Sequence, residues 1–258
     1  MIDTHSHIYG PEYDEDRELV IQRARQAGVE RILLPNINEA SIAPMLSLCH
    51  AFPGYCYPMM GLHPEDVADD YLQVLDRMEE RLKTSSHPYI AVGEVGLDFY
   101  WDASRSVQQI DAFTRQIEWA VRYRLPLMIH SRSSHSELVQ AIRPYVSEGL
   151  TGVFHCFGGT ADEAQELLFF DGFVLGIGGV STFKKSPLPE VLKTVPLQRI
   201  VLETDSPYLS PVPYRGKRNE PAYVVEVMNK VADIYNVSPQ EVENVTNANV
   251  KRLFLGIK

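Results

Sequence analysis

Short apolar runs rich in β-branched residues alternate along this chain with longer amphipathic stretches. The runs are MID at the start, VERILLP (29–35), YCYPMMG (55–61), YIAVGEVG (89–96), LPLMIH (125–130), TGVFH (151–155), GFVLGIG (172–178) and RIVLETD (199–205). Runs of this length between polar loops are typical of buried strands. The stretches between them, such as VQQIDAFTRQIEWAVRY, repeat apolar residues every three or four positions, which predicts helices.

Eight strand and helix repeats predict an α/β fold of the TIM (β/α)₈ barrel type. The length of 258 residues is close to the roughly 250 residues of such a barrel. The alternative is an open doubly wound sheet, but no glycine-rich phosphate-binding sequence follows the first strand. Because no linker or low-complexity segment divides the chain, we expect one barrel domain over residues 1–258.

The last part of the chain predicts two helices separated by NVSP. Ser238 is expected to cap the second helix, with Pro239 at its first position and Glu241 completing a capping box.

The composition is that of a globular protein, and the net charge gives no long-range positive field that would attract nucleic acid. Hydrophobic residues make up 45% of the chain and charged residues 22%, and the formal net charge is -10. A polyanion would therefore have to be bound by local groups or by metal ions. Three cysteines, no signal peptide and no apolar run near the ~20 residues of a membrane span predict a soluble cytoplasmic protein with no membrane contact. No obligate protein partner is inferred.

Residues that can bind a metal ion lie at or near the ends of several predicted strands. Side chains two positions apart on a strand point to the same side, so His5 and His7 are expected to face the same way. The other candidates are Glu94, His130, His155 and Asp205. Since the carboxyl ends of barrel strands meet at one rim, we expect these side chains to converge there.

Six such ligands are more than one open catalytic site uses, because a catalytic zinc ion typically takes about three protein ligands. We therefore predict two divalent ions. His5, His7 and Asp205 would hold one, His130 and His155 the other, and Glu94 would bridge them. Two ions about 3.5–4 Å apart can clamp a phosphoryl or carbonyl group during its displacement. The imidazole-rich ligand set suits zinc or manganese better than magnesium.

Seven sequence blocks resemble, in the same order, those of the TatD family of metal-dependent deoxyribonucleases, a branch of the amidohydrolase superfamily. The blocks are DTHSH, GLHP, GEVGLD, MIHSR, HCFGG, ETDSPYL and RGKRNEP. They extend from residue 1 to about Phe254, and the region from ETDSPYL to RGKRNEP is the most specific. The resemblance implies a TIM barrel with two divalent ions, commonly magnesium in relatives. It also implies hydrolysis of DNA phosphodiester bonds, often as a 3′–5′ exonuclease.

The resemblance also implies roles for single residues. The six metal ligands carry over to the same positions, and Asp205 becomes the general base with Glu94 as the shared catalytic carboxylate. His63 and Arg132 would contact the substrate phosphate. After MIHSR, many relatives have an acidic or small residue and then alanine, whereas this chain reads SSHSEL.

Further candidates lie in loops near the same rim. Arg215, Lys217 and Arg218 of RGKR are expected to contact additional phosphates, with a solvated charge cluster as the alternative. Asn219 and Glu220 are candidates to cap the next helix.

Aromatic and acidic residues follow the fourth predicted strand. Phe99, Tyr100 and Trp101 could stack on unpaired bases or pack beneath the loop. Asp98 is a candidate acceptor for a ligand imidazole.

The leading hypothesis is a two-metal hydrolase that cleaves DNA phosphodiester bonds, with RNA as a second candidate substrate. An alternative keeps the metals but acts on a non-nucleic-acid ester, lactone or amide, because a barrel rim supports many chemistries. A third hypothesis is a metal-stabilised binding protein without turnover. His63, Arg132 and RGKR favour a phosphate substrate.

Overall fold

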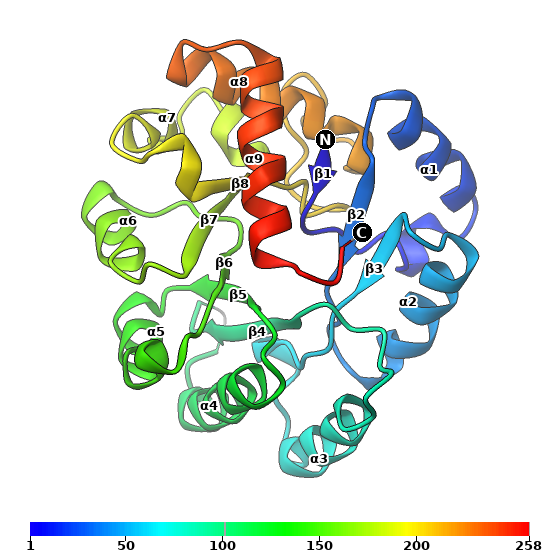
Figure 1. Ribbon diagram of the computed structural model, residues 1–258, viewed down its shortest axis with the longest axis vertical. Coiled ribbons are helices and arrows are strands. Elements are labelled where there is room, and N and C mark those ends of the chain that lie inside the picture. Colours follow the sequence, from blue (N-terminus) through cyan, green and yellow to red (C-terminus); the bar gives the residue numbers. More distant parts are fainter. Residues whose placement is uncertain (101, 258) are drawn as a thin grey trace.

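The computed structural model describes residues 1–100 and 102–257, in which parallel strands form a ring surrounded by helices (Figure 1). The strands within these ranges are β1 (Ile2–Asp3), β2 (Arg31–Leu34), β3 (Cys56–Pro58), β4 (Val92–Asp98), β5 (Leu127–Arg132), β6 (Gly152–Phe154), β7 (Phe173–Ile177) and β8 (Ile200–Leu202). Each overlaps one of the predicted apolar runs, and most are shorter than the run.

All neighbouring strands pair in parallel, in the order β1-β2-β3 and β4-β5-β6-β7-β8. Isolated parallel bridges lie at the two seams between these groups, Met60 with Val92 and Ser6 with Ser206. The amide of Thr4 also donates to the carbonyl of Leu202 at 3.1 Å. The strands thus follow one another around a ring in chain order, and the predicted α/β TIM-barrel fold is confirmed.

Helices form the outer layer of the barrel (Figure 1). They are α1 (Arg17–Gln26), α2 (Glu39–Ala51), α3 (Tyr71–Leu82), α4 (Ser106–Tyr123), α5 (His135–Ile142), α6 (Ala161–Leu168), α7 (Leu188–Leu192) and α8 (Val224–Tyr235). The last helix, α9 (Pro239–Leu253), lies across one end of the barrel instead. At the start of α9, Ser238 Oγ accepts a hydrogen bond from the Glu241 amide at 3.1 Å, as expected. The capping box is half formed, because within the described ranges Glu241 returns no bond to Ser238. No helix in the described ranges has both the length and the apolar character that crossing a membrane requires.

Alternate residues of each strand are buried on opposite sides of the barrel wall. In β8, Val201 packs inside the barrel, whereas Ile200 and Leu202 belong to the outer core beneath the helices. Burial on both faces explains why the strands read as nearly continuous apolar runs.

The interior core is closed at one end by α9. Its residue Val250, together with Leu253 and the following Phe254, packs against interior residues near the beginnings of the strands, such as Ile2 and Leu33. Figure 1 shows α9 crossing the mouth of the barrel at this end. The opposite end, where the strands finish, is therefore the end that remains for a functional site.

Candidate metal centre

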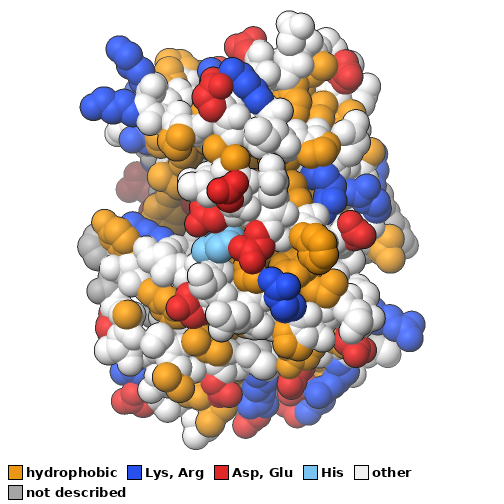
Figure 2. Space-filling view, turned by 90° about the vertical axis from the view of Figure 1, so that its left-hand side faces the viewer, with side chains coloured by type: hydrophobic (Ala, Val, Ile, Leu, Met, Phe, Trp, Pro, Cys, Tyr) orange, Lys and Arg blue, Asp and Glu red, His pale blue; other side chains and the backbone are white. Residues whose placement is uncertain are grey.

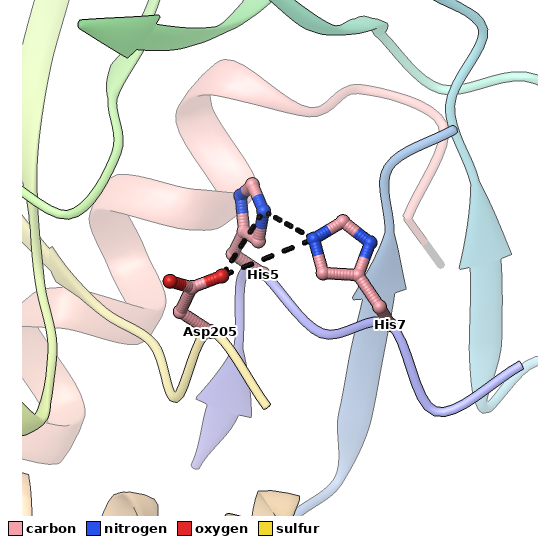
Figure 3. A group of neighbouring side chains, drawn as sticks. All are labelled: His5, His7 and Asp205. Atoms are coloured by element: carbon pink, nitrogen blue, oxygen red, sulfur yellow. Dashed lines mark hydrogen bonds and ion pairs between the residues drawn. The ribbon is translucent and has the colours of Figure 1, made fainter. Parts of the chain in front are cut away.

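His5, His7 and Asp205 form a first group of candidate ligands (Figure 3). The two histidines follow β1 and Asp205 follows β8, and the β1–β8 seam brings the two segments together. The Nε2 atoms of His5 and His7 lie 3.1 Å apart, and Asp205 Oδ1 lies 3.8 Å from each of them. Asp205 adopts a left-handed φ of 56°, which aspartate tolerates better than most residues. This turn brings its carboxylate close to the imidazoles.

Glu94 lies at the centre of the site because β4 contains a bulge. Gly93 pairs with Met128 and Val95 with Ile129, so Glu94 is an extra residue between two consecutive pairs. Such bulges redirect a side chain and occur often beside active sites. The Glu94 side chain is 4% exposed, although it is a carboxylate.

The two oxygens of Glu94 face different histidine pairs. Oε2 lies 3.1 Å from His5 Nε2 and 3.3 Å from His7 Nε2. Oε1 lies 2.8 Å from His155 Nε2 and 3.1 Å from His130 Nδ1. The structure therefore brings all six predicted ligands together, with Glu94 placed between the two groups.

Hydrogen bonds outside the site indicate which imidazole nitrogens face inward. Tyr9 donates its hydroxyl proton to the Pro35 carbonyl at 2.6 Å, so its oxygen is left to accept from His7 Nδ1 at 2.9 Å. Asp98 Oδ2 accepts from His130 Nε2 at 2.8 Å. His7 Nε2 and His130 Nδ1 then carry lone pairs that point into the site. This donor set of lone pairs and carboxylates fits divalent cations.

Burial and charge set the ionisation of the two central carboxylates. Burial acts to raise the pKa of Glu94, but the nearby imidazoles of His155, His5 and His63 outweigh it and hold the pKa well below its usual range. Burial raises the pKa of Asp205 to about 6, against the opposing attraction of His155 and His7. Both side chains are therefore carboxylates at neutral pH.

His63 lies beside the second group of histidines but differs from them in its hydrogen bonding. Its Nδ1 accepts from the Glu65 amide at 3.2 Å, so the proton of the neutral ring is on Nε2. This Nε2 lies 3.3 Å from Glu94 Oε1. His63 therefore presents a hydrogen-bond donor to the site, which suits the predicted phosphate contact.

Arg132 ends β5 at the rim of the barrel, and its Cζ lies 3.7 Å from the centre of the Tyr100 ring. Tyr100 is 54% exposed, whereas Phe99 is partly buried against the core. The neighbouring aromatic residue at position 101, Trp101, lies outside the described residues. The predicted acceptor role of Asp98 is confirmed by its bond to His130.

The three basic residues of RGKR are exposed, but they differ in their contacts. Arg215 Cζ lies 3.8 Å from the Phe183 ring centre, and Lys217 Nζ lies 5.8 Å from that of Tyr214. Arg218 donates to the Glu12 carbonyl at 2.6 Å and to Asp16 Oδ2 at 2.8 Å. Arg218 thus ties its loop to the segment before α1, and its phosphate contact stays a prediction.

Asn219 does not cap the next helix, and Glu220 occupies the N-cap position of the 3-10 helix Pro221–Tyr223 without a side-chain cap hydrogen bond. Asn219 is completely buried, and its Nδ2 donates to the carbonyls of Thr204 at 2.7 Å and Tyr208 at 2.6 Å. These bonds clamp the turn that carries Asp205. Glu220 instead forms an ion pair with Arg23 at 2.6 Å.

Two further buried carboxyl groups beside the site were not singled out from the sequence. Asp3 Oδ1 accepts from the amides of Thr204 at 2.9 Å and His5 at 3.3 Å, so it joins the two ligand-bearing segments. Glu203 is fully buried beside His155. The two-residue spacing that paired His5 with His7 also pairs Glu203 with Asp205, and this signal could have identified Glu203.

Comparisons with known proteins match nearly the whole chain. Residues 2–255 match the family model for TatD related DNase. The chain is 37% identical over 256 residues to the uncharacterized metal-dependent hydrolase YabD of Bacillus subtilis, covering 98% of each. It is 32% identical to the 3′-5′ ssDNA/RNA exonuclease TatD of Erwinia tasmaniensis, covering 98% of this chain and 99% of that one. The crystal structure of YJJV, a TatD homolog from Escherichia coli, matches with a TM-score of 0.91 and 29% identity, over 99% of this chain and 98% of that one. The chain therefore belongs to the TatD-related DNase family of metal-dependent hydrolases.

Proposed function

We propose that this protein is a two-metal phosphodiesterase that removes nucleotides from the 3′ end of single-stranded DNA and also of RNA. The observation that carries the proposal is Glu94, whose two carboxylate oxygens each face a different pair of histidines. The relative from Erwinia tasmaniensis, named as a 3′-5′ ssDNA/RNA exonuclease, supports the choice of substrate.

The six candidate ligands divide into two sets that share one residue. One ion would be held by His5, His7 and Asp205, the other by His130 and His155, with Glu94 common to both. When bound, divalent ions supply positive charge that neutralises and polarises a phosphodiester group. Among zinc, manganese and magnesium, the four imidazoles favour zinc or manganese.

Three side chains of the chain itself would act on the substrate. Asp205, ionised at neutral pH, would accept the proton of the attacking water. The Nε2–H of His63 would donate to a phosphate oxygen, and the guanidinium of Arg132 at the rim could bind two phosphate oxygens at once. These donors would bind an anion despite the net charge of -10.

The proposal is tested by replacing Glu94 with glutamine and following 3′-end and 5′-end labelled oligonucleotides of DNA and RNA. We expect nucleotide release from the 3′ end to fall by more than about 100-fold, because even the loss of an outer partner of a metal ligand costs about 10–100-fold. Elemental analysis should show less bound metal. Glu166→Gln, an exposed change on α6, is the matched control and should leave both unchanged.

Full activity in Glu94→Gln would contradict the proposal. A panel that adds a lactone, a simple ester and a dipeptide tests the alternative chemistry. Turnover of one of these by the wild-type protein, with none of DNA or RNA, would replace the phosphodiesterase proposal with an amidohydrolase-type activity.

We also propose that the protein works in the cytoplasm as one barrel domain. Cys49, Cys56 and Cys156 all lie in the described ranges and are free, which supports a reducing compartment.

A further inference from the structure

The side chain of Glu203 is fully buried next to the candidate metal centre, and the proposed mechanism does not use it. Its Oε1 accepts a hydrogen bond from the Cys156 amide. Its Oε2 has no hydrogen-bond partner within the described ranges. A buried carboxylate oxygen without a partner is costly, so a donor is expected for it in the functional protein.

Two histidines that belong to different ligand groups lie near this carboxylate. The rings of His5 and His155 stack with their centres 3.9 Å apart and their planes inclined by 14°. Both turn Nε2 toward Glu94, at 3.1 and 2.8 Å. Both Nδ1 atoms are buried and lack a hydrogen-bond partner in the described part of the chain.

Glu203 lies beside both rings. Its Oε1 lies 3.7 Å from His155 Nδ1. One nitrogen of each ring and a carboxylate oxygen of Glu203 all lie within 4.8 Å of one another. Because both Nε2 atoms face Glu94, the Nδ1 atoms are the ones left for Glu203. The distance of 3.7 Å is longer than a hydrogen bond, so the carboxylate and the ring must approach each other for this bond to form.

The backbone of β7 leaves room for this carboxylate. A Cβ atom at Gly176 would lie 2.2 Å from Glu203 Oε2 and 3.0 Å from the Cα of His155. Glycine is therefore needed where β7 approaches Glu203, since the Cβ of any other residue would collide with the carboxylate.

We propose that Glu203 is a positioning residue that accepts the Nδ1–H of both His5 and His155 and so leaves both Nε2 lone pairs for metal ions. Metal-binding histidines commonly donate their second ring N–H to a carboxylate. A carboxylate offers about four acceptor positions, and Cys156 takes one of those on Glu203. Tyr9 and Asp98 each orient one histidine, whereas Glu203 would orient one histidine in each ligand group. This inference rests on the proposed metal sites.

The test is nuclear magnetic resonance of the zinc-loaded protein labelled with ¹⁵N-histidine, in which Nδ1–H protons bonded to a carboxylate resonate far downfield. In Glu203→Gln, we expect the Nδ1–H signals of both His5 and His155 to move upfield, with the signals of His7 and His130 unchanged. Asp98→Asn is the matched control and should move only the His130 signal.

Zinc affinity, measured by chelator competition, gives an independent readout. Glu203→Gln should weaken zinc binding at both groups by about 10–100-fold, whereas Asp98→Asn should weaken it at the His130 group alone. Glu203→Asp keeps the charge but shortens the reach, and it should give the same pattern if the glutamine variant does not fold.

Unchanged signals of His5 and His155, or movement of one of them alone, would overturn the positioning role. Loss of one whole equivalent of zinc in Glu203→Gln would also overturn it, because Glu203 would then be a ligand itself. Either result would leave the proposed function intact as long as the wild-type protein binds zinc and cleaves oligonucleotides. Failure of the wild-type protein to do either would overturn the proposed function itself.

Discussion

Single hydrogen bonds outside the candidate metal centre determine how its histidines are oriented. His7 is held by Tyr9 and His130 by Asp98, each through the ring nitrogen that faces away from Glu94. A ring that loses this partner can rotate or place its proton on the inward nitrogen, and that nitrogen can then no longer bind a cation.

Removing the Tyr9 hydroxyl tests this dependence. We expect Tyr9→Phe to weaken metal binding at the His5, His7 and Asp205 group by about 10-fold or more, because His7 Nδ1 loses its acceptor. Isothermal titration calorimetry measures this affinity. Tyr71→Phe also removes a hydroxyl hydrogen bond, but at an exposed site on α3, and should bind metal as the wild type does. Equal affinities in all three proteins would contradict the prediction.

The buried carboxyl of Asp3 predicts an unusual dependence of stability on pH in the metal-free protein. Burial raises its pKa from 3.8 to about 8, although hydrogen bonds from Thr204 oppose the shift. Between these values the folded chain keeps a proton that the unfolded chain releases. The free energy of unfolding therefore falls as pH rises, by at most about 1.4 kcal/mol per pH unit from this group.

Asp3→Asn should remove this part of the pH dependence, because asparagine resembles the protonated carboxyl. Urea unfolding in the presence of a chelator, at pH values of about 5, about 6.5 and about 8, measures it. Asp233→Asn, an exposed change on α8, is the control and should follow the wild type. A parallel pH dependence in Asp3→Asn and the wild type would show that Asp3 has an ordinary pKa when folded.

Residue positions in the site were predictable where one local rule applied. The rule that strand ends meet at one rim selected five of the six candidate ligands, whereas Glu94 lies inside its apolar run, and the structure places all six together. Contacts between residues far apart in the sequence were not predictable. The sequence suggested that Arg218 is available to bind phosphate, but it contacts Glu12 and Asp16, which lie 206 and 202 positions away. The sequence suggested a helix cap for Asn219 because its actual hydrogen-bond partners were also unknown. These partners are backbone carbonyls in the turn around Asp205.

At the scale of whole elements, the periodic pattern located the strands and helices but not how they close the barrel. The pattern at the C-terminal end predicts two helices with one buried face each, but it does not predict what each face packs against. The structure shows that the face of α9 with Val250 and Leu253 fills the end of the barrel opposite the metal centre. The bulge that places Glu94 in the site was also not predictable from the sequence, because one extra residue does not change the apolar composition of a strand.

Phe254 is the part of this closure that can be tested most directly. It is fully buried just after α9, and Phe254→Ala should lower the free energy of unfolding by about 3–5 kcal/mol through the cavity it leaves. Leu255→Ala is the matched control, since the neighbouring Leu255 is 86% exposed and should cost little. Urea unfolding of the two variants measures the difference. Similar losses in both would mean that Phe254 does not seal the barrel.

At the scale of the whole molecule, acidic charge predominates, because the chain has 34 acidic and 24 basic residues. On the face drawn in Figure 2, acidic and basic side chains are interspersed, with small groups of hydrophobic atoms between them. The net charge is -10. Binding of nucleic acid should therefore depend on the few cations near the rim, and its affinity should fall only moderately with salt.

Lys217 tests whether the RGKR segment contributes to this binding. If it contacts a phosphate, Lys217→Ala should reduce the slope of log affinity against log salt for a single-stranded oligonucleotide by about 1. Fluorescence anisotropy at several salt concentrations measures the slope, with Glu94→Gln as the background to prevent cleavage. Lys251→Ala, on α9 at the other end of the barrel, should leave the slope unchanged. If the salt slope is the same in Lys217→Ala and Lys251→Ala, Lys217 does not contact the substrate and RGKR is a solvated charge cluster.

The shared carboxylate in β4 has a consequence for how the centre fills. One side chain with one negative charge faces both histidine pairs, so if two cations bind as proposed, the first uses negative charge that the second also needs. The later arrival meets a less negative cavity and a like charge at short range. The two cations should then bind with unequal affinities. At low metal concentration, the activity of the enzyme would follow occupancy of the weaker site.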